Sequence, residues 1–360
     1  MNVIRYYPRA VTGDGGMTRA VRAAAEAATR FGVRTTILYD GTGAASPPDR
    51  PGVRWVAVRH RGPQRLRTPV DLAGHLRGQD VLVLHSAWSW PNVHAGEAAR
   101  RIGLPYLLEP RGAYDPHIVG RHRLMKTAWW LLHERRLVRD AAAVHVFFDE
   151  ERPHMRALGY EGPLVVAPNG VDPAGPVATD RRGGYLLWLG RFDPEHKGLD
   201  LLLGAIRALP ARRRPQVRLH GPDWHGRKAV VRQMVADMCL DPWVHVGDQA
   251  LGATKRDLLT AATAFAYPSR WEGFGNSVAE AAAVGLPVVT GWYPLGRYLA
   301  SRGGAVACPH SVSALAAGID QVMTADAADI GERGRSIVES TMTWDDVARQ
   351  WADQVERLPL

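Results

Sequence analysis

Apolar residues along the chain gather in short runs, and the stretches between these runs are rich in Ala, Arg and Leu. A short apolar run bounded by polar or turn residues is typical of a buried β-strand. In the first half such runs occupy residues 2–7, 35–39, 53–58, 81–85, 105–108, 143–148 and 164–167. Helical stretches fall between most of them, so the pattern predicts βαβ units and a parallel, doubly wound α/β sheet.

The alternation stops at residues 168–176, whose density of Pro and Gly is typical of a linker. It restarts with apolar runs at 185–189, 217–219, 244–246, 264–267, 287–289 and 305–307. We therefore expect two Rossmann-like domains, residues 1–172 and 173–342, that face each other across a cleft. Residues 343–360 begin with the capping pattern Thr343-Trp344-Asp345-Asp346 and predict a C-terminal helix that could pack on either domain.

Composition and charge narrow the functional classes only partly. A chain of 360 residues suits two domains, and its formal net charge is +9. The excess lies mainly before residue 181, with 24 Lys and Arg against 17 Asp and Glu, compared with 21 against 19 afterwards. Nucleic acid, an anionic membrane surface and an acidic substrate are all compatible with this charge. A solvated basic surface without a partner is the simplest interpretation.

The cysteines and the lengths of the apolar runs indicate the cellular location. Cys239 and Cys308 lie far apart and show no metal-ligand spacing. The N-terminus is too short and too polar for a signal peptide, and no apolar run reaches membrane-spanning length. We therefore expect a cytoplasmic protein.

Residues 270–285 stand between two predicted strands and contain a glycine loop followed by an alanine-rich segment. Gly273 and Gly275 allow the backbone to approach a ligand closely. Asn276 or Ser277 can cap a short helix that ends at Gly285. Because a helix N-terminus presents free N–H groups and partial positive charge, this loop predicts an anion site.

Two carboxylates, Glu272 and Glu280, bracket the predicted anion site. A phosphate site flanked by carboxylates suggests a ligand with both phosphate and hydroxyl groups, such as a sugar nucleotide. A capped helix with one surface Glu would explain the helix, but neither the glycine loop nor the second carboxylate.

A second charged segment, residues 190–198, follows the first strand of the second half. Arg191 and Lys197 flank a turn, and Gly198 precedes a helix with a regular apolar stripe. Two cations beside a helix N-terminus can hold a diphosphate without a metal ion. The alternative is that both are solvated surface charges. This alternative is less favoured because residues 270–285 lie in the same domain.

The two segments together resemble the GT4-type retaining glycosyltransferases of the GT-B fold. The resemblance depends on Gly190-Arg191 with Lys197-Gly198, and on the seven residues that separate Glu272 from Glu280. It is specific between residues 190 and 290. It is looser in the first half, where residues 110–116 and 168–172 carry it.

This resemblance implies roles for the charged residues. Arg191 and Lys197 would bind the donor diphosphate and offset the charge on the leaving nucleotide, and Glu272 would act on the donor sugar. Other donor-binding residues implied are Phe274, Gly275 and Asn276 at the sugar, Ser277 and Val278 at the phosphate, Glu280 at the ribose, and Gly247, Asp248 and Gln249 beside the base.

The resemblance also implies transfer with retention of the anomeric configuration, with no metal ion and no cofactor beyond the nucleotide diphosphate sugar. Residues 253–255 slightly favour GDP over UDP as the nucleotide. Arg111 stands where the family usually has a His near the C6 hydroxyl of the donor sugar. A longer, permanently charged side chain there suggests an unusual or C6-modified sugar. The alternative is that Arg111 merely replaces one hydrogen-bond donor with another.

In the first domain, residues 13–19 lack the third glycine of a dinucleotide fingerprint because Thr18 takes its place. As the glycine loop of the family, Gly15 and Gly16 would lie under the donor phosphates, and Arg19 near the acceptor. A plain strand–helix turn is the alternative.

Residues 85–92 follow a first-domain strand and would point into the same cleft. Trp88 and Trp90 could stack on an acceptor ring, with His85 or Asn92 orienting it, although tryptophans packed in the core explain the pattern equally well. Residues 121–132 place bases beside two tryptophans, which invites a membrane-surface interpretation. A solvated basic face over a packed aromatic stripe is preferred.

The expected function is therefore a glycosyltransferase that uses a small polar acceptor, as in antibiotic or other secondary-metabolite biosynthesis. Assembly of a cell-envelope polysaccharide or glycolipid is the alternative. The alternatives from other classes are a GT-B-fold nucleotide-sugar epimerase, a phosphorylase and a basic binding module. No nucleic-acid partner is expected, because no recognition motif accompanies the basic charge.

Overall fold

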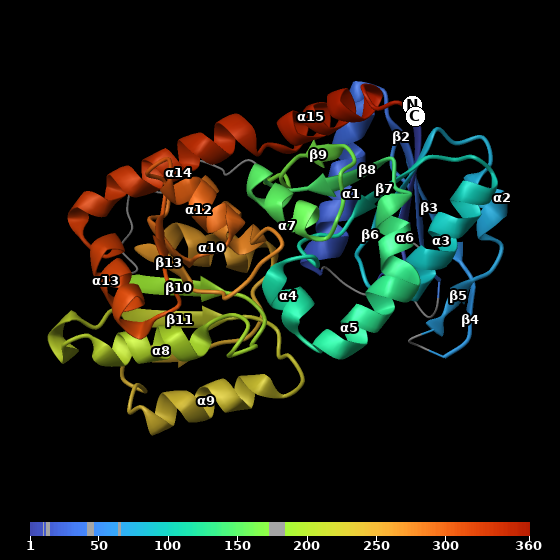
Figure 1. Cartoon of the computed structure of the whole chain (residues 1–360). Helices are drawn as coiled ribbons and strands as arrows, with labels where there is room; N and C mark the ends of the chain where they lie inside the picture. Colours follow the sequence, from blue (N-terminus) through green and yellow to red (C-terminus); the bar gives the residue numbers. More distant parts are fainter. Residues whose placement is uncertain (10, 12–14, 42–46, 64–65, 173–183) are drawn as a thin grey trace. The chain divides into compact units, whose positions relative to one another are not determined.

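The apolar runs form parallel strands in a computed structural model that describes residues 1–9, 11, 15–41, 47–63, 66–172 and 184–360. Within these residues the first sheet has the order β3-β2-β1-β6-β7-β8-β9 (Figure 1). Its strands are β1 Asn2–Tyr7, β2 Arg34–Asp40, β3 Val53–Val58, β6 Val81–His85, β7 Tyr106–Glu109, β8 Ala143–Val146 and β9 Leu164–Val166. The register is parallel throughout; Val3, for example, pairs with Thr35 on β2 and with Val81 on β6.

The second sheet has the order β12-β11-β10-β13-β14-β15 and is also parallel. Its strands are β10 Tyr185–Leu189, β11 Gln216–His220, β12 Val244–Val246, β13 Ala264–Tyr267, β14 Val288–Gly291 and β15 Val306–Cys308. A short antiparallel pair, β4 His60–Arg61 and β5 Thr68–Pro69, was not predicted, because two-residue strands carry no periodicity.

The chain divides into two compact units. The first contains Met1–Gly170 and Trp344–Leu360, and the second contains Val171–Thr343. The expected boundaries at 172 and 342 lie within two residues of this division. Part of the predicted linker, residues 173–176, lies outside the described residues.

Helices cover both faces of each sheet. Those of the first unit are α1 Gly16–Ala28, η1 Thr29–Phe31, α2 Leu72–Leu76, α3 Trp90–Arg101, α4 Pro116–Gly120, α5 Arg123–Trp129, η3 Trp130–Glu134, α6 Arg135–Arg139, η4 Asp149–Glu151, α7 Arg152–Ala157 and α15 Trp344–Glu356. Those of the second are α8 Leu199–Ala208, η5 Ala211–Arg213, α9 Arg227–Asp237, α10 Gly252–Ala261, α11 Asn276–Ala283, α12 Pro294–Ala300, α13 Val312–Val322, η6 Ala325–Ala327 and α14 Ala328–Thr341.

The two faces of the first sheet bury alternate residues of each strand, as side chains on a strand must. On β6, Val81 and Val83 belong to one apolar cluster, whereas Leu82 and Leu84 belong to another on the opposite face. Every residue of β6 is buried, so this central strand reads as a continuous apolar run rather than an alternating one.

The C-terminal helix α15 belongs to the first unit and packs beside α1 (Figure 1). Its buried stripe includes Trp351 and Val355, which join the cluster containing Val83. The guanidinium of Arg5 on β1 lies over the ring of Trp351, 4.8 Å from its centroid. The structure therefore resolves which domain carries this helix.

Candidate active site

The charged loops of the second unit lie where the order of its strands reverses. β10 is paired with β11 on one side and with β13 on the other. In a doubly wound parallel sheet, ligands bind in the crevice outside the carboxyl ends of the strands at such a switch point. The loops after β10 and β13 are residues 190–198 and 268–275, so the topology brings together the two segments predicted to bind an anion.

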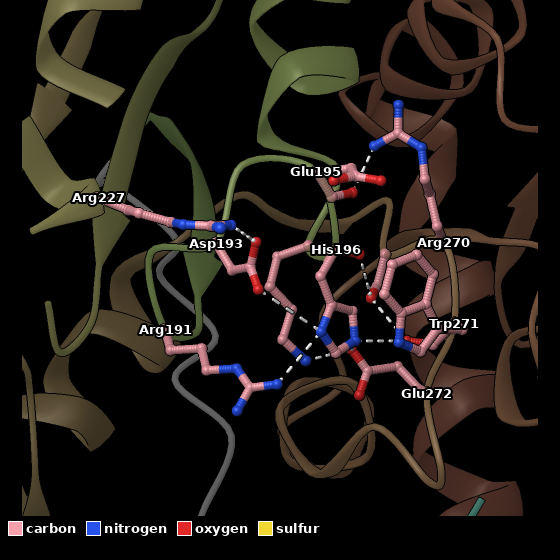
Figure 2. A network of polar contacts seen from close by, with 10 residues as sticks. Arg191, Asp193, Glu195, His196, Arg227, Arg270, Trp271 and Glu272 are labelled. Atoms are coloured by element: carbon pink, nitrogen blue, oxygen red, sulfur yellow. Dashed lines mark hydrogen bonds and ion pairs between the residues drawn. The ribbon is translucent and has the colours of Figure 1, made fainter. Parts of the chain in front are cut away.

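Hydrogen bonds hold these two loops against each other. The carbonyl of His196 accepts from the backbone N–H of Arg270 at 3.0 Å and from the hydroxyl of Ser269 at 2.9 Å. The guanidinium of Arg270 binds both carboxylate oxygens of Asp200 at 2.8 and 2.6 Å. Figure 2 shows Trp271 beside His196, and the Arg270 guanidinium near Glu195. The loops therefore form one braced surface.

Gly198 permits the close approach of the two loops. Its φ is +64°, and a Cβ at this position would lie 2.0 Å from the carbonyl oxygen of Pro268. Only glycine fits here without displacing the backbone of the second loop.

Lys197 and Glu272 form the central ion pair. The Lys197 Nζ donates to Glu272 Oε1 at 2.5 Å, and the two side chains are 9% and 11% exposed. Burial alone raises the pKa of Glu272, but the charge and hydrogen bond of Lys197, together with His196 and Ser269, outweigh burial and hold that pKa below its ordinary value of 4.5. The pair therefore presents an ammonium group whose charge is already partly compensated.

His196 orients Arg191. Burial, followed by the charge of Lys197, lowers the pKa of His196 to about 4, so its ring is neutral at pH 7. Its Nε2 lies 2.9 Å from the Trp271 carbonyl and must donate to it, which leaves Nδ1 to accept from Arg191 Nη2 at 3.2 Å. The ring also stacks on Trp271 with centroids 4.3 Å apart. His196 thus has a defined tautomer and holds one edge of the Arg191 guanidinium (Figure 2).

The Nε of Arg191 is a donor that a ligand could satisfy. Its guanidinium lies over the ring of Trp224, 4.4 Å from the centroid. The buried Nε meets no acceptor among the residues that the structure describes. A buried donor without a partner is uncommon, and an anion bound beside Lys197 would satisfy it.

The start of α11 corrects two expectations. Gly275, with a φ of +99°, is the residue that caps the helix, and no side chain caps it. Asn276 is already helical and so cannot be the cap. The N–H of Val278 donates to the Gly275 carbonyl at 2.9 Å, because the first turn closes on itself, so Val278 does not offer this group to a phosphate. The amide of Ser277 lies in the same first turn, where the helix supplies no internal acceptor.

Phe274 is buried, while Asn276 and Ser277 are partly exposed at the mouth of the loop. Glu280, one turn further along α11, pairs with Lys255 of α10. A ligand hydroxyl at Glu280 would therefore share this carboxylate with Lys255.

The segment after β12 lies at the edge of the sheet. Gly247 is buried against the His220 ring, and Asp248 and Gln249 are exposed. Asp248 pairs with Lys228, and its carbonyl lies 3.0 Å from His220 Nδ1. Since β12 is two strands from β10, these residues lie about 10 Å from it across the strand ends.

In the first unit, Arg111 belongs to a buried charge cluster around Glu109. Arg111 Nη2 lies 2.6 Å from Glu109 Oε1, and Nη1 and Nε approach Asn169 Oδ1 and His85 Nδ1 at 3.4 and 3.5 Å. Burial raises the pKa of Glu109, but Arg111 is the largest of several groups that bring it well below its ordinary value. The Arg111 guanidinium is therefore anchored by a carboxylate of its own domain.

His85 and Asn92 have structural roles, which corrects the expectation that they orient an acceptor. Both side chains are fully buried. The Asn92 amide donates to the carbonyls of His85 and Ser86 at 2.9 Å each and so holds the turn after β6. Burial lowers the pKa of His85 to about 4, and its Nδ1 faces Glu109 at 3.2 Å.

Trp88 and Trp90 remain partly exposed, although their indole N–H groups are engaged. Trp88 donates to the Ala113 carbonyl at 2.9 Å, and Trp90 donates to the Thr68 hydroxyl at 3.2 Å. Ser86, Trp88 and Arg111 have positive φ values of 74°, 56° and 54°, and all three follow the adjacent strands β6 and β7. Such strain gathers at functional sites, so these strand ends stay candidates for acceptor contact.

The glycine loop after β1 is described only from Gly15 onward; residues 13 and 14 lie outside the described part. Gly15 precedes α1, Gly16 begins it, and Arg19 donates its N–H to the Gly15 carbonyl at 3.0 Å. The turn thus lies at the carboxyl end of a central strand.

Two residues of the second unit's site, His196 and Trp224, were not predicted, and Lys255 was predicted only as part of the 253–255 segment that favours GDP. His196 lies inside the predicted loop, and Trp224 follows β11, so strand-end position could have indicated both. Nothing local identifies Lys255 as the partner of Glu280, because the pair joins two helices across the fold.

Comparison with known proteins matches both halves of the chain. Residues 15–170 match the family described as "Glycosyl transferase 4-like domain", and residues 183–325 match "Glycosyl transferases group 1". The chain is 32% identical over 148 residues to the O-antigen chain mannosyltransferase B of Escherichia coli, covering 40% of this chain and 38% of that protein. It is 31% identical over 238 residues to the D-inositol 3-phosphate glycosyltransferase of Frankia alni, covering 59% and 54%. These matches therefore span less than two thirds of either relative.

Solved structures share the architecture over nearly the whole chain. Sucrose-phosphate synthase from Thermosynechococcus elongatus has a TM-score of 0.75 at 18% identity, covering 99% of this chain and 98% of that one. Anabaena HepE in complex with UDP and glucose has a TM-score of 0.76 at 17% identity, covering 99% and 100%. At these identities the likeness establishes the fold.

Proposed function

Because the chain belongs to the GT4-type glycosyltransferases of the GT-B fold, we propose that it transfers a sugar from a nucleotide diphosphate to a polar acceptor. The observation that carries the proposal is the buried Arg191 Nε, which meets no acceptor in the described part of the chain and lies in the same loop as Lys197. A diphosphate would bind both cations at the switch point of the sheet.

The charge arrangement suits departure of a nucleotide. As the bond from the sugar to the diphosphate breaks, negative charge grows on the leaving phosphate oxygen. Arg191 and Lys197, fixed beforehand by His196 and Glu272, would stabilise that charge without reorganising. We propose that the transfer is metal-independent and retains the anomeric configuration, as in the family that the sequence resembles.

The donor nucleotide is proposed to be GDP or UDP. The 253–255 segment favoured GDP in the sequence, but Lys255 pairs with Glu280. The solved HepE structure carries UDP. Glu272 would bind the sugar through its second carboxylate oxygen, and Glu280 the ribose. The Arg111 guanidinium is paired with Glu109, so its charge is not available in full to a carboxylate on the sugar. We therefore propose that Arg111 donates a hydrogen bond to one position of the sugar.

For the acceptor, we propose a glycan or glycolipid of the cell envelope in preference to a small secondary metabolite. The support is one relative of this chain, whose name describes it as an O-antigen chain mannosyltransferase. A small acceptor in antibiotic biosynthesis remains the second candidate, supported by the replacement of the family's His by Arg111.

Calorimetry with GDP and UDP tests the donor site. Arg191→Ala and Glu280→Ala should each weaken nucleotide binding by roughly 1–3 kcal/mol, the value of a charged hydrogen bond. Arg212→Ala is the matched control, because Arg212 is exposed and precedes β11, at the opposite end of that strand from the site. Normal binding by both site variants would show that the site is misassigned. Thermal stabilisation by an oligonucleotide but by neither nucleotide would favour a binding module instead.

Mass spectrometry of incubations with a donor panel and envelope-glycan acceptors then identifies the transferred sugar. A product that keeps the donor's anomeric configuration is expected, and an inverted product would contradict the retaining mechanism.

A further inference from the structure

The α5 face is an exposed apolar surface on the first unit. It comprises Leu124, Met125, Leu131 and Leu132 of α5 and η3, whose exposed fractions are 88%, 65%, 63% and 72%. Leu131 and Leu132 follow Leu124 and Met125 by seven residues each, a spacing that returns a side chain to nearly the same side of a helix, so the four side chains form a stripe. Apolar groups gathered on one helix in this way mark an interaction surface, unlike single exposed residues.

The helix cannot turn this stripe inward, because its opposite side is locked. The indole N–H of Trp129 donates to Glu134 Oε2 at 2.8 Å. Glu134 Oε1 accepts from the Trp88 backbone N–H at 2.9 Å and from the Tyr114 hydroxyl at 2.7 Å. Trp130 packs against Trp88 with ring centroids 6.2 Å apart. The aromatic residues therefore bind the helix to the core, and the leucines face outward.

Most of the cationic side chains of this segment flank the stripe, whereas the Lys126 ammonium lies over the Trp88 ring and donates to the Ile118 carbonyl. Between residues 120 and 140 the chain has six cations, Arg121, Arg123, Lys126, Arg135, Arg136 and Arg139, and two acids, Glu134 and Asp140. Glu134 is buried and engaged, and Asp140 is paired with arginines that include Arg136 and Arg139. Arg123 and Arg135 are exposed at the two ends of the stripe. The surface around the leucines is thus positively charged.

We propose that the α5 face docks this protein on an anionic lipid bilayer. The leucines and Met125 would enter the boundary of the acyl chains, while the arginines meet the lipid phosphates at the same depth. No helix among the described residues is long and apolar enough to cross a membrane, so α5 and η3 would lie in the plane of the interface.

Charge complementarity favours lipid over a protein partner. Protein interfaces concentrate their binding energy in tryptophan, tyrosine and arginine. Here Trp129 and Trp130 are partly buried and contact Glu134 and Trp88, so the most exposed side chains of the face are aliphatic rather than aromatic. The excess of positive charge in the first half of the chain would attract an anionic surface from beyond contact distance.

Vesicle flotation of the full chain tests the proposal without any sugar nucleotide, so its outcome is independent of the proposed transferase activity. Vesicles of phosphatidylcholine with phosphatidylglycerol should bind the protein at low salt, and vesicles of phosphatidylcholine alone should bind it weakly. Leu124→Ser with Leu132→Ser should lower the partition coefficient on the order of tenfold. Arg123→Gln and Arg135→Gln should each lower it about fivefold and flatten its salt dependence.

Ile102→Ser with Val230→Ser is the matched control, because these residues are 40% and 50% exposed outside the α5 face. The control should bind vesicles like the unchanged protein, and all variants should keep its melting temperature. Absence of binding to anionic vesicles would overturn the proposal, as would equal binding by the leucine variant and the control. If the leucine variant instead converts a dimer to a monomer in size-exclusion chromatography with vesicle binding unchanged, the face joins two copies of the chain and the proposal is wrong.

Discussion

Lys197→Met removes the charge that compensates buried Glu272 while keeping the length of the side chain. In the folded protein the two groups lie 2.5 Å apart and both side chains are largely buried. The variant must therefore either bury an unpaired carboxylate or protonate it.

The free-energy cost of protonating Glu272 determines how much stability Lys197→Met loses. Holding a carboxyl group neutral costs about 1.4 kcal/mol for each pH unit above its ordinary pKa, which is 4.5 for Glu272. The cost is therefore about 3.4 kcal/mol at pH 7 and about 0.7 kcal/mol at pH 5. The larger value falls in the range of roughly 3–5 kcal/mol for removing one partner of a buried pair.

The sign of the pH dependence differs between the two proteins. In the unchanged protein the pKa of Glu272 is below 4.5, so its stabilising contribution is present above that pH and is lost as pH falls through the folded value. In Lys197→Met the folded pKa rises above 4.5, so stability falls as pH rises from 4.5 towards 7. The difference in the free energy of unfolding should thus grow by about 2.7 kcal/mol between pH 5 and pH 7.

Urea unfolding at both pH values measures this difference, with Glu272→Gln and the double variant as controls. In the Glu272→Gln background no carboxylate remains, so Lys197→Met should cost little and show no dependence on pH. The reasoning is refuted if the deficit of Lys197→Met is the same at pH 5 and pH 7, or if it persists in full in the Glu272→Gln background.

Three further predictions concern other residues. Gly198→Ala should lower stability by more than about 2 kcal/mol in urea unfolding, because a Cβ would meet Pro268; Gly252→Ala, also at positive φ but in open space, should cost less, and equal losses would contradict the steric argument. Glu134→Ala should lower the melting temperature with a loss of at least about 3 kcal/mol, since one buried and two partly buried donors lose their acceptor; a neutral result would show that water replaces the carboxylate. Arg111→His should lower stability by roughly 1–3 kcal/mol through the lost Glu109 contact and shift donor preference in a turnover panel; unchanged preference would remove Arg111 from the sugar site.

Much of the fold was predictable because a buried parallel strand is recognised from residues that are adjacent in the sequence. Each strand of the two large sheets was expected within a few residues of its observed bounds, since a strand buried on both faces must be a short apolar run. The spacing of Glu272 and Glu280 and the pair Arg191 and Lys197 were equally local signals.

The site was predicted less completely, because its partners come from distant segments. The bond from His196 to Arg191, the stacking of Arg191 on Trp224 and the pairing of Glu280 with Lys255 join different loops and helices. His85 and Asn92 were misassigned because a polar residue after a strand can either face a ligand or hold the turn, and burial decides which.

By itself, the sequence determined the alternation of strand and helix, the division into two domains and the loops that carry charge, because each depends on residues close together in the chain. Only the tertiary structure decided the strand order that places those loops together and the packing of α15 on the first unit. It also decided the direction of the leucines on α5. That helix is apolar on two sides, with tryptophans on one and leucines on the other, and periodicity cannot tell which side a core accepts. The hydrogen bonds of Glu134 hold the tryptophan side of the helix against the core, so the leucines face outward.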